Sequence, residues 1–208
     1  DHNQSILASA NSSLTVQSPK DGFSEQNPQE WIDSTMECLE ALKSKKPKEF
    51  SQTISRGISG HMHGATLIDK DGNVIRPCIL WNDTRSYQEC EEFEKQNFDV
   101  RSISGNITMP GVTAPKINWI KNNEIDNFRK IFKVLLPKDY LRFVLTGEFF
   151  SEMSDASGTL WLDIKHRKWS NKLLSCSFLE EKHMPNLVEG NELTGYLKKE
   201  LKEKFNFN

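Results

Sequence analysis

The stretch GATLIDKDGNVIRPCIL, residues 64–80, places two apolar runs on either side of Asp71 and Gly72. Both runs are rich in aliphatic residues, which is typical of extended chain with at least one buried face. An Asp-Gly pair favours a tight turn, because glycine adopts left-handed backbone angles at little cost. The stretch therefore predicts two extended arms joined by a turn.

A helix is predicted upstream of these arms. Asn27 is a good N-cap, Pro28 suits the first helical position, and Glu30 lies three residues after the cap. The residues that then recur at helical spacing form one apolar face: Trp31, Ile32, Thr35, Cys38, Leu39 and Leu42. Further upstream, residues 5–18 alternate weakly and predict extended chain.

Other segments alternate between strand and helix patterns. Residues 52–60 and 131–137 are strand-like, and residues 84–96 have the composition of a surface helix. Helices are also expected from Pro115 to residue 123, across residues 138–147 with Gly147 as the stop, and across 169–179 with Ser170 as the cap. Residues 151–163 are expected to form a loop. This interleaving predicts an α/β or α+β fold with at least one sheet.

The composition excludes several classes of function. The net charge of -2 and the mixed charge pattern do not suggest a nucleic-acid-binding surface. No apolar run reaches the roughly 18–20 residues that a membrane span needs. The four cysteines form no CxxC pair, so reduced and mostly packed thiols in a cytoplasmic protein are expected. They are Cys38, Cys78, Cys90 and Cys176.

Two histidines, His61 and His63, flank Met62 just before the first arm, with Gly60 and Gly64 outside them. On a strand, residues two apart point the same way, so the pair has the spacing of metal ligands, but no third ligand is evident. A structural alternative is one exposed histidine and one core histidine with satisfied hydrogen bonds. A third hypothesis is a small polyol site, since glycines permit close approach, imidazoles bond hydroxyls and methionine forms an adaptable apolar wall.

The stretch LWNDTR, residues 80–85, also leaves alternatives open. Trp81 is either a core residue or a flat face for the C–H side of a sugar. Asp83 either pairs with Arg85 or caps a helix that starts near Thr84. A structural role is the preferred hypothesis for Asp83 and Arg85.

Residues 109–123 contain a Gly-x-Thr-x-x-Lys pattern that begins at Gly111. This pattern of residues predicts a flexible loop that leads into a helix. Lys116 is either a ligand for phosphate or a solvated lysine on the surface. The solvated lysine is the preferred hypothesis. No phosphate-cradling GxxxxGK loop and no Ser-His-acid arrangement is evident.

Five segments in order together resemble the FGGY family of carbohydrate kinases. They are SGHMHGATL (59–67), RPCILWNDTR (76–85), GNITMPGVTAPKINWI (105–120), VLLPKDYLRFVLTGEF (134–149) and SDASGTLWLD (154–163). The resemblance extends from about Ile6 to Thr194. The segment from Gly111 to Asn123 resembles a family signature. The Met-His-Gly triplet and the LLPKDYLR run are more particular to the branch that acts on xylulose.

The resemblance implies a fold and a reaction. The fold would be an RNase H-like domain of the actin-like ATPase type, with a mixed sheet flanked by helices and incomplete at both ends. The sugar would lie in the cleft between this domain and a second one. The reaction would transfer the γ-phosphoryl group of ATP, with Mg²⁺, to the C5 hydroxyl of D-xylulose, which gives D-xylulose 5-phosphate.

The resemblance also implies roles for single residues. Met62 and His63 map onto the pair that contacts the sugar, and Trp81 maps near the sugar's apolar side. The loop at Gly111 and Val112 would lie against the same pocket. His61 stands where relatives usually carry glutamine, which bears on the sugar preference. No catalytic residue maps onto this chain.

The family's phosphate-binding hairpin and its nucleotide-binding second domain have no counterpart among residues 1–208, and the first residue is Asp1. We therefore expect a sugar-binding fragment that is inactive alone, with ATP and Mg²⁺ bound largely outside it. Kinases for another ketose or polyol, and a non-catalytic sugar-binding module, are the alternatives. Many relatives pair up, so a homodimer is a further expectation.

Overall fold

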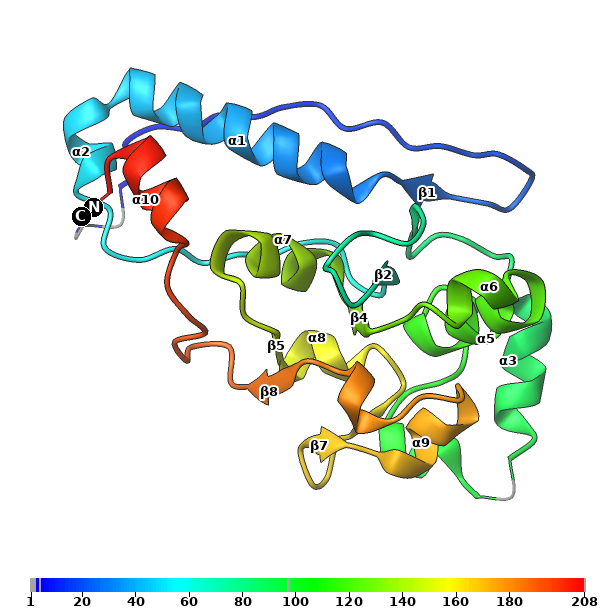
Figure 1. Cartoon of the computed structure of the whole chain (residues 1–208). Helices are drawn as coiled ribbons and strands as arrows, with labels where there is room; N and C mark the ends of the chain where they lie inside the picture. Colours follow the sequence, from blue (N-terminus) through cyan, green and yellow to red (C-terminus); the bar gives the residue numbers. More distant parts are fainter. Residues whose placement is uncertain (1–2, 4, 97, 208) are drawn as a thin grey trace.

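A computed structural model describes residues 3, 5–96 and 98–207 (Figure 1). Its elements in chain order are β1 (Glu25–Gln26), α1 (Pro28–Lys45), α2 (Pro47–Ser51), β2 (Thr66–Ile68), β3 (Cys78–Ile79), α3 (Tyr87–Glu94), α4 (Val100–Ser104), α5 (Thr113–Asn123), α6 (Ile125–Phe128), β4 (Lys133–Leu135), α7 (Pro137–Thr146), β5 (Phe150–Glu152), α8 (Met153–Ser157), β6 (Leu162–Asp163), β7 (Lys168–Trp169), α9 (Asn171–Cys176), the 3-10 helix η1 (Glu181–His183), β8 (Asn186–Val188) and α10 (Lys199–Phe205).

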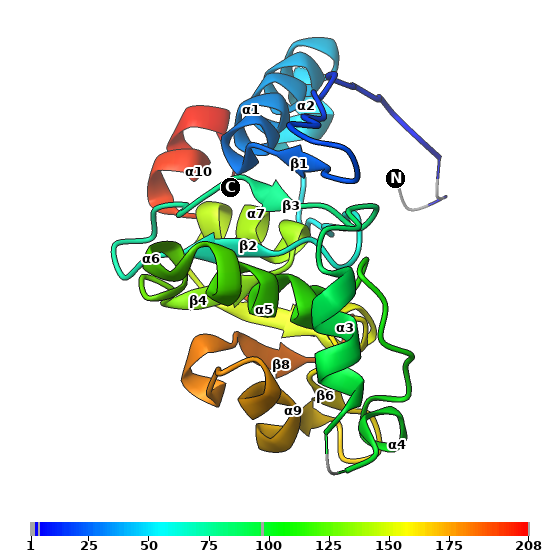
Figure 2. The same cartoon turned by 90° about the vertical axis from the view of Figure 1, so that its right-hand side faces the viewer.

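The strands pair two by two. The pairs β1–β3, β2–β4 and β6–β7 are antiparallel, and β5–β8 is parallel. A bridge between Ala65 and Ile79 links the first two pairs. Figure 2 shows β2, β3 and β4 in the middle of the molecule, with α1 and α2 at one end and α9 at the other. The fold is therefore mixed α/β with small sheets.

The β2–β4 pair separates two hydrophobic cores. Leu67 lies opposite Val134, and both side chains belong to the larger core beside α5 and α9. The next residues along each strand, Ile68 and Leu135, belong to the smaller core beneath α1 and α7. Successive side chains on a strand point to opposite faces, so each strand contributes to both cores. This is why Leu67 and Ile68 are both completely buried although they are adjacent in the sequence.

Several predicted helices and turns are confirmed. Helix α1 begins after Asn27, whose side chain accepts from the Gln29 N–H at 3.0 Å. Gly72 has the left-handed φ of 83° that the predicted turn requires. Gly147 ends α7 in the same conformation, and Ser170 caps α9 by accepting from Leu173 N–H.

Two predicted segments are wrong. Residues 52–60 contain no strand, because no neighbouring strand pairs with their backbone among the described residues. The predicted loop 151–163 contains part of β5, helix α8 and β6. The cause of α8 is local: the Glu152 carboxylate accepts from the N–H groups of Ser154 and Asp155 and so caps the helix.

Pro115 and Pro137 each lie in the first turn of a helix. Helix α5 begins at Thr113, two residues before Pro115, which the first turn tolerates because its N–H would be unpaired. Pro137 opens α7 instead of ending the preceding strand. Helix α3 forms as predicted, but it buries Phe93, Cys90 and Glu89 and is not only a surface element.

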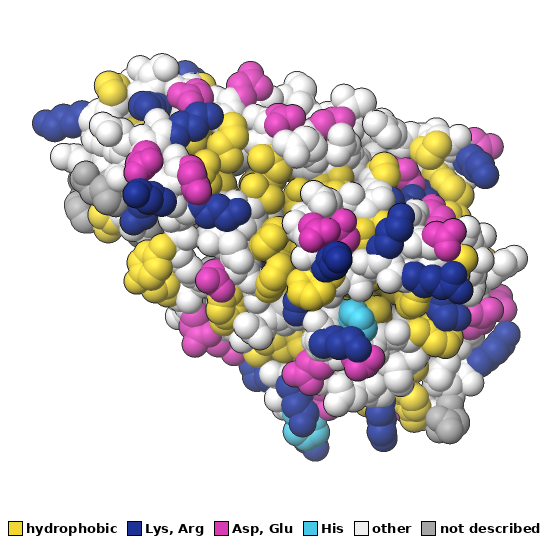
Figure 3. Space-filling model, in the orientation of Figure 1, with side chains coloured by type: hydrophobic (Ala, Val, Ile, Leu, Met, Phe, Trp, Pro, Cys, Tyr) yellow, Lys and Arg dark blue, Asp and Glu magenta, His cyan; other side chains and the backbone are white. Residues whose placement is uncertain are grey.

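The outer surface mixes both signs of charge. Figure 3 shows lysine, arginine and carboxylate side chains interspersed over one face, with apolar side chains visible between α1 and α7. Within the described residues, no helix combines the length and apolarity needed to cross a bilayer. All four cysteines are free thiols.

Candidate sugar site

Residues 61–64 form a tight turn and not the start of a strand. The Gly64 N–H donates to the Met62 carbonyl at 2.8 Å, and His63 has a left-handed φ of 63°. Left-handed angles are uncommon for a residue with a side chain and indicate local constraint. Because the strand alternation does not apply here, the prediction that both imidazoles share one face is wrong.

The His63 imidazole is half-buried and fixed by one hydrogen bond. Its Nδ1 lies 2.8 Å from the Gly158 carbonyl oxygen, which can only accept. Nδ1 therefore carries the proton. Burial lowers the pKa of His63, with the Lys116 charge acting in the same direction and the Gly158 bond opposing it. In the resulting neutral tautomer Nε2 is an acceptor, which suits a hydroxyl donor.

His61 occupies a different place. Its ring packs edge-on against Trp31, with centroids 5.5 Å apart, and both ring nitrogens are buried without a partner among the described residues. It lines a groove of about 330 Å³ between α1 and α7, beside Pro137 and Cys38. The structural alternative of an exposed and a satisfied histidine is therefore also wrong. No group of three His, Cys, Asp or Glu residues is placed for a metal ion in the described part of the chain.

The unpaired His61 ring predicts acid sensitivity. Burial lowers its pKa below the ordinary 6.5, so the unfolded chain takes up a proton first as the pH falls. The contribution of His61 to the free energy of unfolding has its full value above about pH 6.5 and declines as the pH falls below that value. We expect His61→Gln to reduce the loss of stability between pH 7.5 and pH 5, measured by urea unfolding of the 208-residue chain. An equal loss in both proteins would contradict this account.

Gly111 lies against the backbone of Trp81. A Cβ atom at Gly111 would stand 2.5 Å from the Trp81 carbonyl oxygen, so only glycine permits this contact. The side chains of Trp81 and Met62 are 52% and 47% exposed, so neither is a core residue. Val112 is buried and immediately precedes α5. The exposed indole fits the predicted sugar-facing role better than the core alternative.

Lys116 is the residue that the sequence interpretation missed. It is fully buried, and its Nζ donates to the carbonyls of His63 at 2.9 Å and Gly111 at 2.7 Å. The solvated alternative for Lys116 is therefore wrong, and a side chain with no exposed surface does not fit the phosphate alternative either. Burial lowers the pKa of Lys116 to about 8.

A signal for the burial of Lys116 was present in the sequence. Four residues on one face of α5 are completely buried and follow the i, i+3, i+4, i+7 spacing of a helix face: Thr113, Lys116, Ile117 and Ile120.

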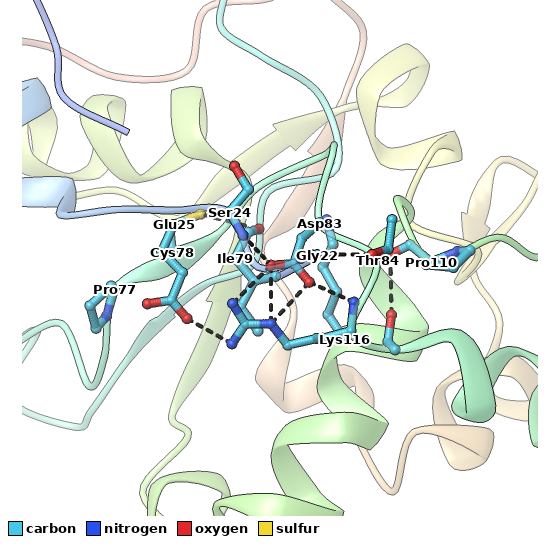
Figure 4. A network of polar contacts seen from close by, with 12 residues as sticks. Gly22, Ser24, Glu25, Pro77, Cys78, Ile79, Asp83, Thr84, Pro110 and Lys116 are labelled. Atoms are coloured by element: carbon cyan, nitrogen blue, oxygen red, sulfur yellow. Dashed lines mark hydrogen bonds and ion pairs between the residues drawn. The ribbon is translucent and has the colours of Figure 1, made fainter. Parts of the chain in front are cut away.

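The turn that carries Trp81 is anchored by a buried charge network (Figure 4). The Asp83 carboxylate accepts from the Ser24 N–H at 2.6 Å and from the Arg85 guanidinium at 2.8 Å. Arg85 also reaches Glu25 at 2.7 Å and lies 3.7 Å over the Phe23 ring. Of the two alternatives for Asp83, the structure shows the pairing with Arg85, and helix α3 begins later, at Tyr87.

The predicted site residues thus come from three segments that meet. Lys116 joins the backbone of His63 to that of Gly111, and Gly111 contacts the backbone of Trp81. Met62 and Val112 are sequence neighbours of these residues. The arrangement combines an acceptor nitrogen, a thioether and an indole, which is chemistry suited to a polyhydroxylated ligand.

Comparisons with known proteins agree with this architecture. The family model for the N-terminal domain of the FGGY family of carbohydrate kinases matches residues 1–208. A xylulose kinase of Escherichia coli (strain K12) is 47% identical over 92% of this chain, and one of Klebsiella pneumoniae is 44% identical over 97%. A crystal structure of a "xyloylose kinase" from Brucella ovis superposes on the whole chain with a TM-score of 0.98 and 50% identity.

The chain is shorter than these proteins. It spans 39% of the Escherichia coli protein, 41% of the Klebsiella pneumoniae protein and 43% of the Brucella ovis chain. The match therefore concerns one domain of a larger relative.

Proposed function

The chain belongs to the FGGY family of carbohydrate kinases as an N-terminal domain, and we propose that it is the sugar-binding part of an enzyme that phosphorylates D-xylulose with ATP. The names of the relatives that are 44–50% identical support xylulose as the sugar. The observation that carries the proposal is the fixed tautomer of His63. Its Nδ1 is occupied by Gly158, which leaves Nε2 as an acceptor beside the exposed Met62.

Each residue of the candidate site has a defined role in this proposal. His63 accepts a hydrogen bond from a xylulose hydroxyl, and Met62 packs beside the carbon chain. Trp81 covers the apolar side of the sugar, and the loop at Gly111 and Val112 closes the pocket behind it. These contacts position the sugar, and positioning is a principal part of catalysis in phosphoryl transfer.

We assign ATP, Mg²⁺ and the base that takes the hydroxyl proton to other parts of the full-length protein, because the chain spans only 39–43% of its relatives and the ammonium of Lys116 is completely buried. The 208-residue chain alone should bind sugar weakly and transfer no phosphate.

The groove between α1 and α7 supports the proposed domain organisation. Its walls include Trp31, Leu39 and Leu141, and the extended segments around Leu14 and Ser59 border it. Neither segment belongs to a strand. A β-hairpin of the full-length protein would fill this groove and complete the sheet.

The test is a substrate panel on the full-length protein, with xylulose, ribulose, gluconate and glycerol as acceptors and ATP as donor. We expect the highest kcat/KM for D-xylulose. His63→Ala should lower that kcat/KM by about 5–150-fold, because a lost hydrogen bond with its partner left unpaired is worth about 1–3 kcal/mol. His166→Ala is the matched control, since that ring is mostly exposed and bonds Asp163.

The possible results separate the alternatives. Preference for another sugar would assign the enzyme to a different ketose or polyol within the family. Binding of sugar without phosphorylation would identify a non-catalytic module. Wild-type kinetics in His63→Ala would remove this histidine from the site.

A further inference from the structure

We propose that Lys116 is a positioning residue that holds the two walls of the sugar pocket at a fixed separation. This inference rests on the proposed function for the identity of the ligand, but the clamp itself is a feature of the fold. One wall is the turn that carries Met62 and His63. The other is the Gly111 loop together with the Trp81 backbone that it touches.

The contacts of Lys116 define the clamp. Its side chain is completely buried, and its ammonium donates to one carbonyl of each wall, at 2.9 Å to His63 and 2.7 Å to Gly111. The His63 carbonyl also accepts from the Thr113 hydroxyl at 3.1 Å. Two donors from the first turn of α5 therefore converge on the same oxygen. Charge-assisted hydrogen bonds of this length are among the stronger ones in proteins.

The clamp explains the unusual backbone of His63. A left-handed φ of 63° in a residue with a side chain persists only where surrounding contacts impose it. The two donors to its carbonyl fix the peptide plane from one side, and the bond from Nδ1 to Gly158 fixes the ring from the other. Without the ammonium, the turn is free to relax, and Nε2 then leaves its position toward the sugar.

The charges around Lys116 make the clamp sensitive to alkaline pH. Burial is the largest influence and lowers its pKa, Cys78 and Asp83 raise it, and Arg85 lowers it. His61 and His63 also sense its charge and are themselves neutral near pH 7, because burial lowers the pKa of each. The pKa of Lys116 is about 8, so the ammonium loses its proton as the pH rises through that value.

Deprotonation affects stability and sugar binding in opposite directions. Because the pKa is lower in the folded chain than the ordinary 10.5, raising the pH from about 8 to about 10.5 favours folding through this group. Over the same window the amine loses its charge and its hydrogen bonds to the two carbonyls weaken. If Lys116 only stabilised the fold, its deprotonation would not raise the KM for sugar while the free energy of unfolding increases.

The experiment uses Lys116→Met in the full-length protein, because methionine has a similar length and no donor. We expect the KM for D-xylulose to rise at least tenfold at pH 7, with the KM for ATP changed less than twofold. The wild-type KM for xylulose should rise above about pH 8, and this alkaline rise should be absent in the variant. Lys121→Met, on the same helix but resting on the exposed Phe178 ring, is the matched control and should behave as wild type.

Thr113→Val provides a second test that keeps the buried charge. It removes the other donor to the His63 carbonyl and should raise the KM for xylulose about threefold with the alkaline rise retained. If Lys116→Met fails to fold, the Thr113→Val result and the wild-type pH profile decide the question. An unchanged KM in Thr113→Val together with a flat wild-type profile would overturn the proposal, as would an unchanged KM in a folded Lys116→Met variant.

A readout without activity separates this inference from the proposed function. In NMR spectra of the full-length protein, Lys116→Met should shift the His63 ring signals, whereas Lys121→Met should not. If no sugar is phosphorylated but these signals move, the proposed function fails and the clamp stands. If xylulose is phosphorylated and the His63 signals do not move in Lys116→Met, the clamp fails and the function stands.

Discussion

Asp83→Ala is expected to destabilise the 208-residue chain by about 3–5 kcal/mol, the usual effect of removing one partner from a buried ion pair. The carboxylate is completely buried and accepts from the Ser24 N–H and from the Arg85 backbone and side chain. Alanine removes both carboxylate oxygens of Asp83, so all of these hydrogen bonds are lost. Arg85, with a side chain only 1% exposed, then keeps Glu25 as its remaining carboxylate.

The environment of Arg85 makes this loss difficult to repair. Its guanidinium is 1% exposed and lies 3.7 Å over the Phe23 ring and 4.8 Å over the Trp119 ring, so water does not replace the lost carboxylate. Urea unfolding followed by tryptophan fluorescence measures the change.

Two further variants test this explanation. Asp126→Ala removes a carboxylate from an exposed pair with Arg129 at 3.5 Å, and the expected change is about 0–1 kcal/mol. The double variant Asp83→Ala with Arg85→Met should be more stable than Asp83→Ala alone, because the buried guanidinium that lost Asp83 is also removed and Arg76 still pairs with Glu25. Similar losses for Asp83→Ala and Asp126→Ala would contradict a buried network.

Elements with local causes could be predicted from the sequence. Asn27 caps α1, Gly72 turns the chain between the two arms, and Gly147 ends α7, each through contacts within a few residues. Such signals depend on neighbours in the sequence and need no knowledge of the rest of the fold. The family and its fold were also predicted, but from the ordered set of motifs and not from these local patterns.

The contacts between segments that are far apart in the sequence could not be predicted from the spacing of residues within each segment. His63 contacts Gly158 across 95 positions, and Lys116 contacts the His63 carbonyl across 53. The strand predicted for residues 52–60 failed for the same reason, since a strand needs a partner that local sequence does not identify. Lys116 was predicted as solvated because lysine is rarely buried without a carboxylate, and here two carbonyls replace it.

Gly158→Ala should impair sugar use severely while leaving the fold intact. A Cβ atom at this position would stand 2.5 Å from Cε1 and 2.8 Å from Nδ1 of the His63 ring. These distances are too short for carbon and nitrogen, so the imidazole must move. The ring is the end of a side chain and can swing away, but it then gives up its bond to the Gly158 carbonyl and with it the fixed tautomer.

The backbone at Gly158 accepts alanine without strain. Its φ of -71° and ψ of -5° at the end of α8 lie in the right-handed helical region. Alanine also restricts the unfolded chain, so the free energy of unfolding should change by less than about 1 kcal/mol. Loss of a positioned acceptor predicts a fall in kcat/KM for xylulose of about 10–100-fold, which corresponds to about 1.4–2.8 kcal/mol.

The matched control is Gly57→Ala, because a Cβ at Gly57 meets no atom within 4 Å. Kinetics of the full-length enzyme should be unchanged in this control, and the KM for ATP should be unchanged in both variants. A combined Gly158→Ala and His63→Ala variant should be no worse than His63→Ala alone, because both changes remove the same hydrogen bond to sugar. Additive losses would show that Gly158 acts on the substrate by another route, and wild-type kinetics in Gly158→Ala would show that the imidazole in its present position does not bind the sugar.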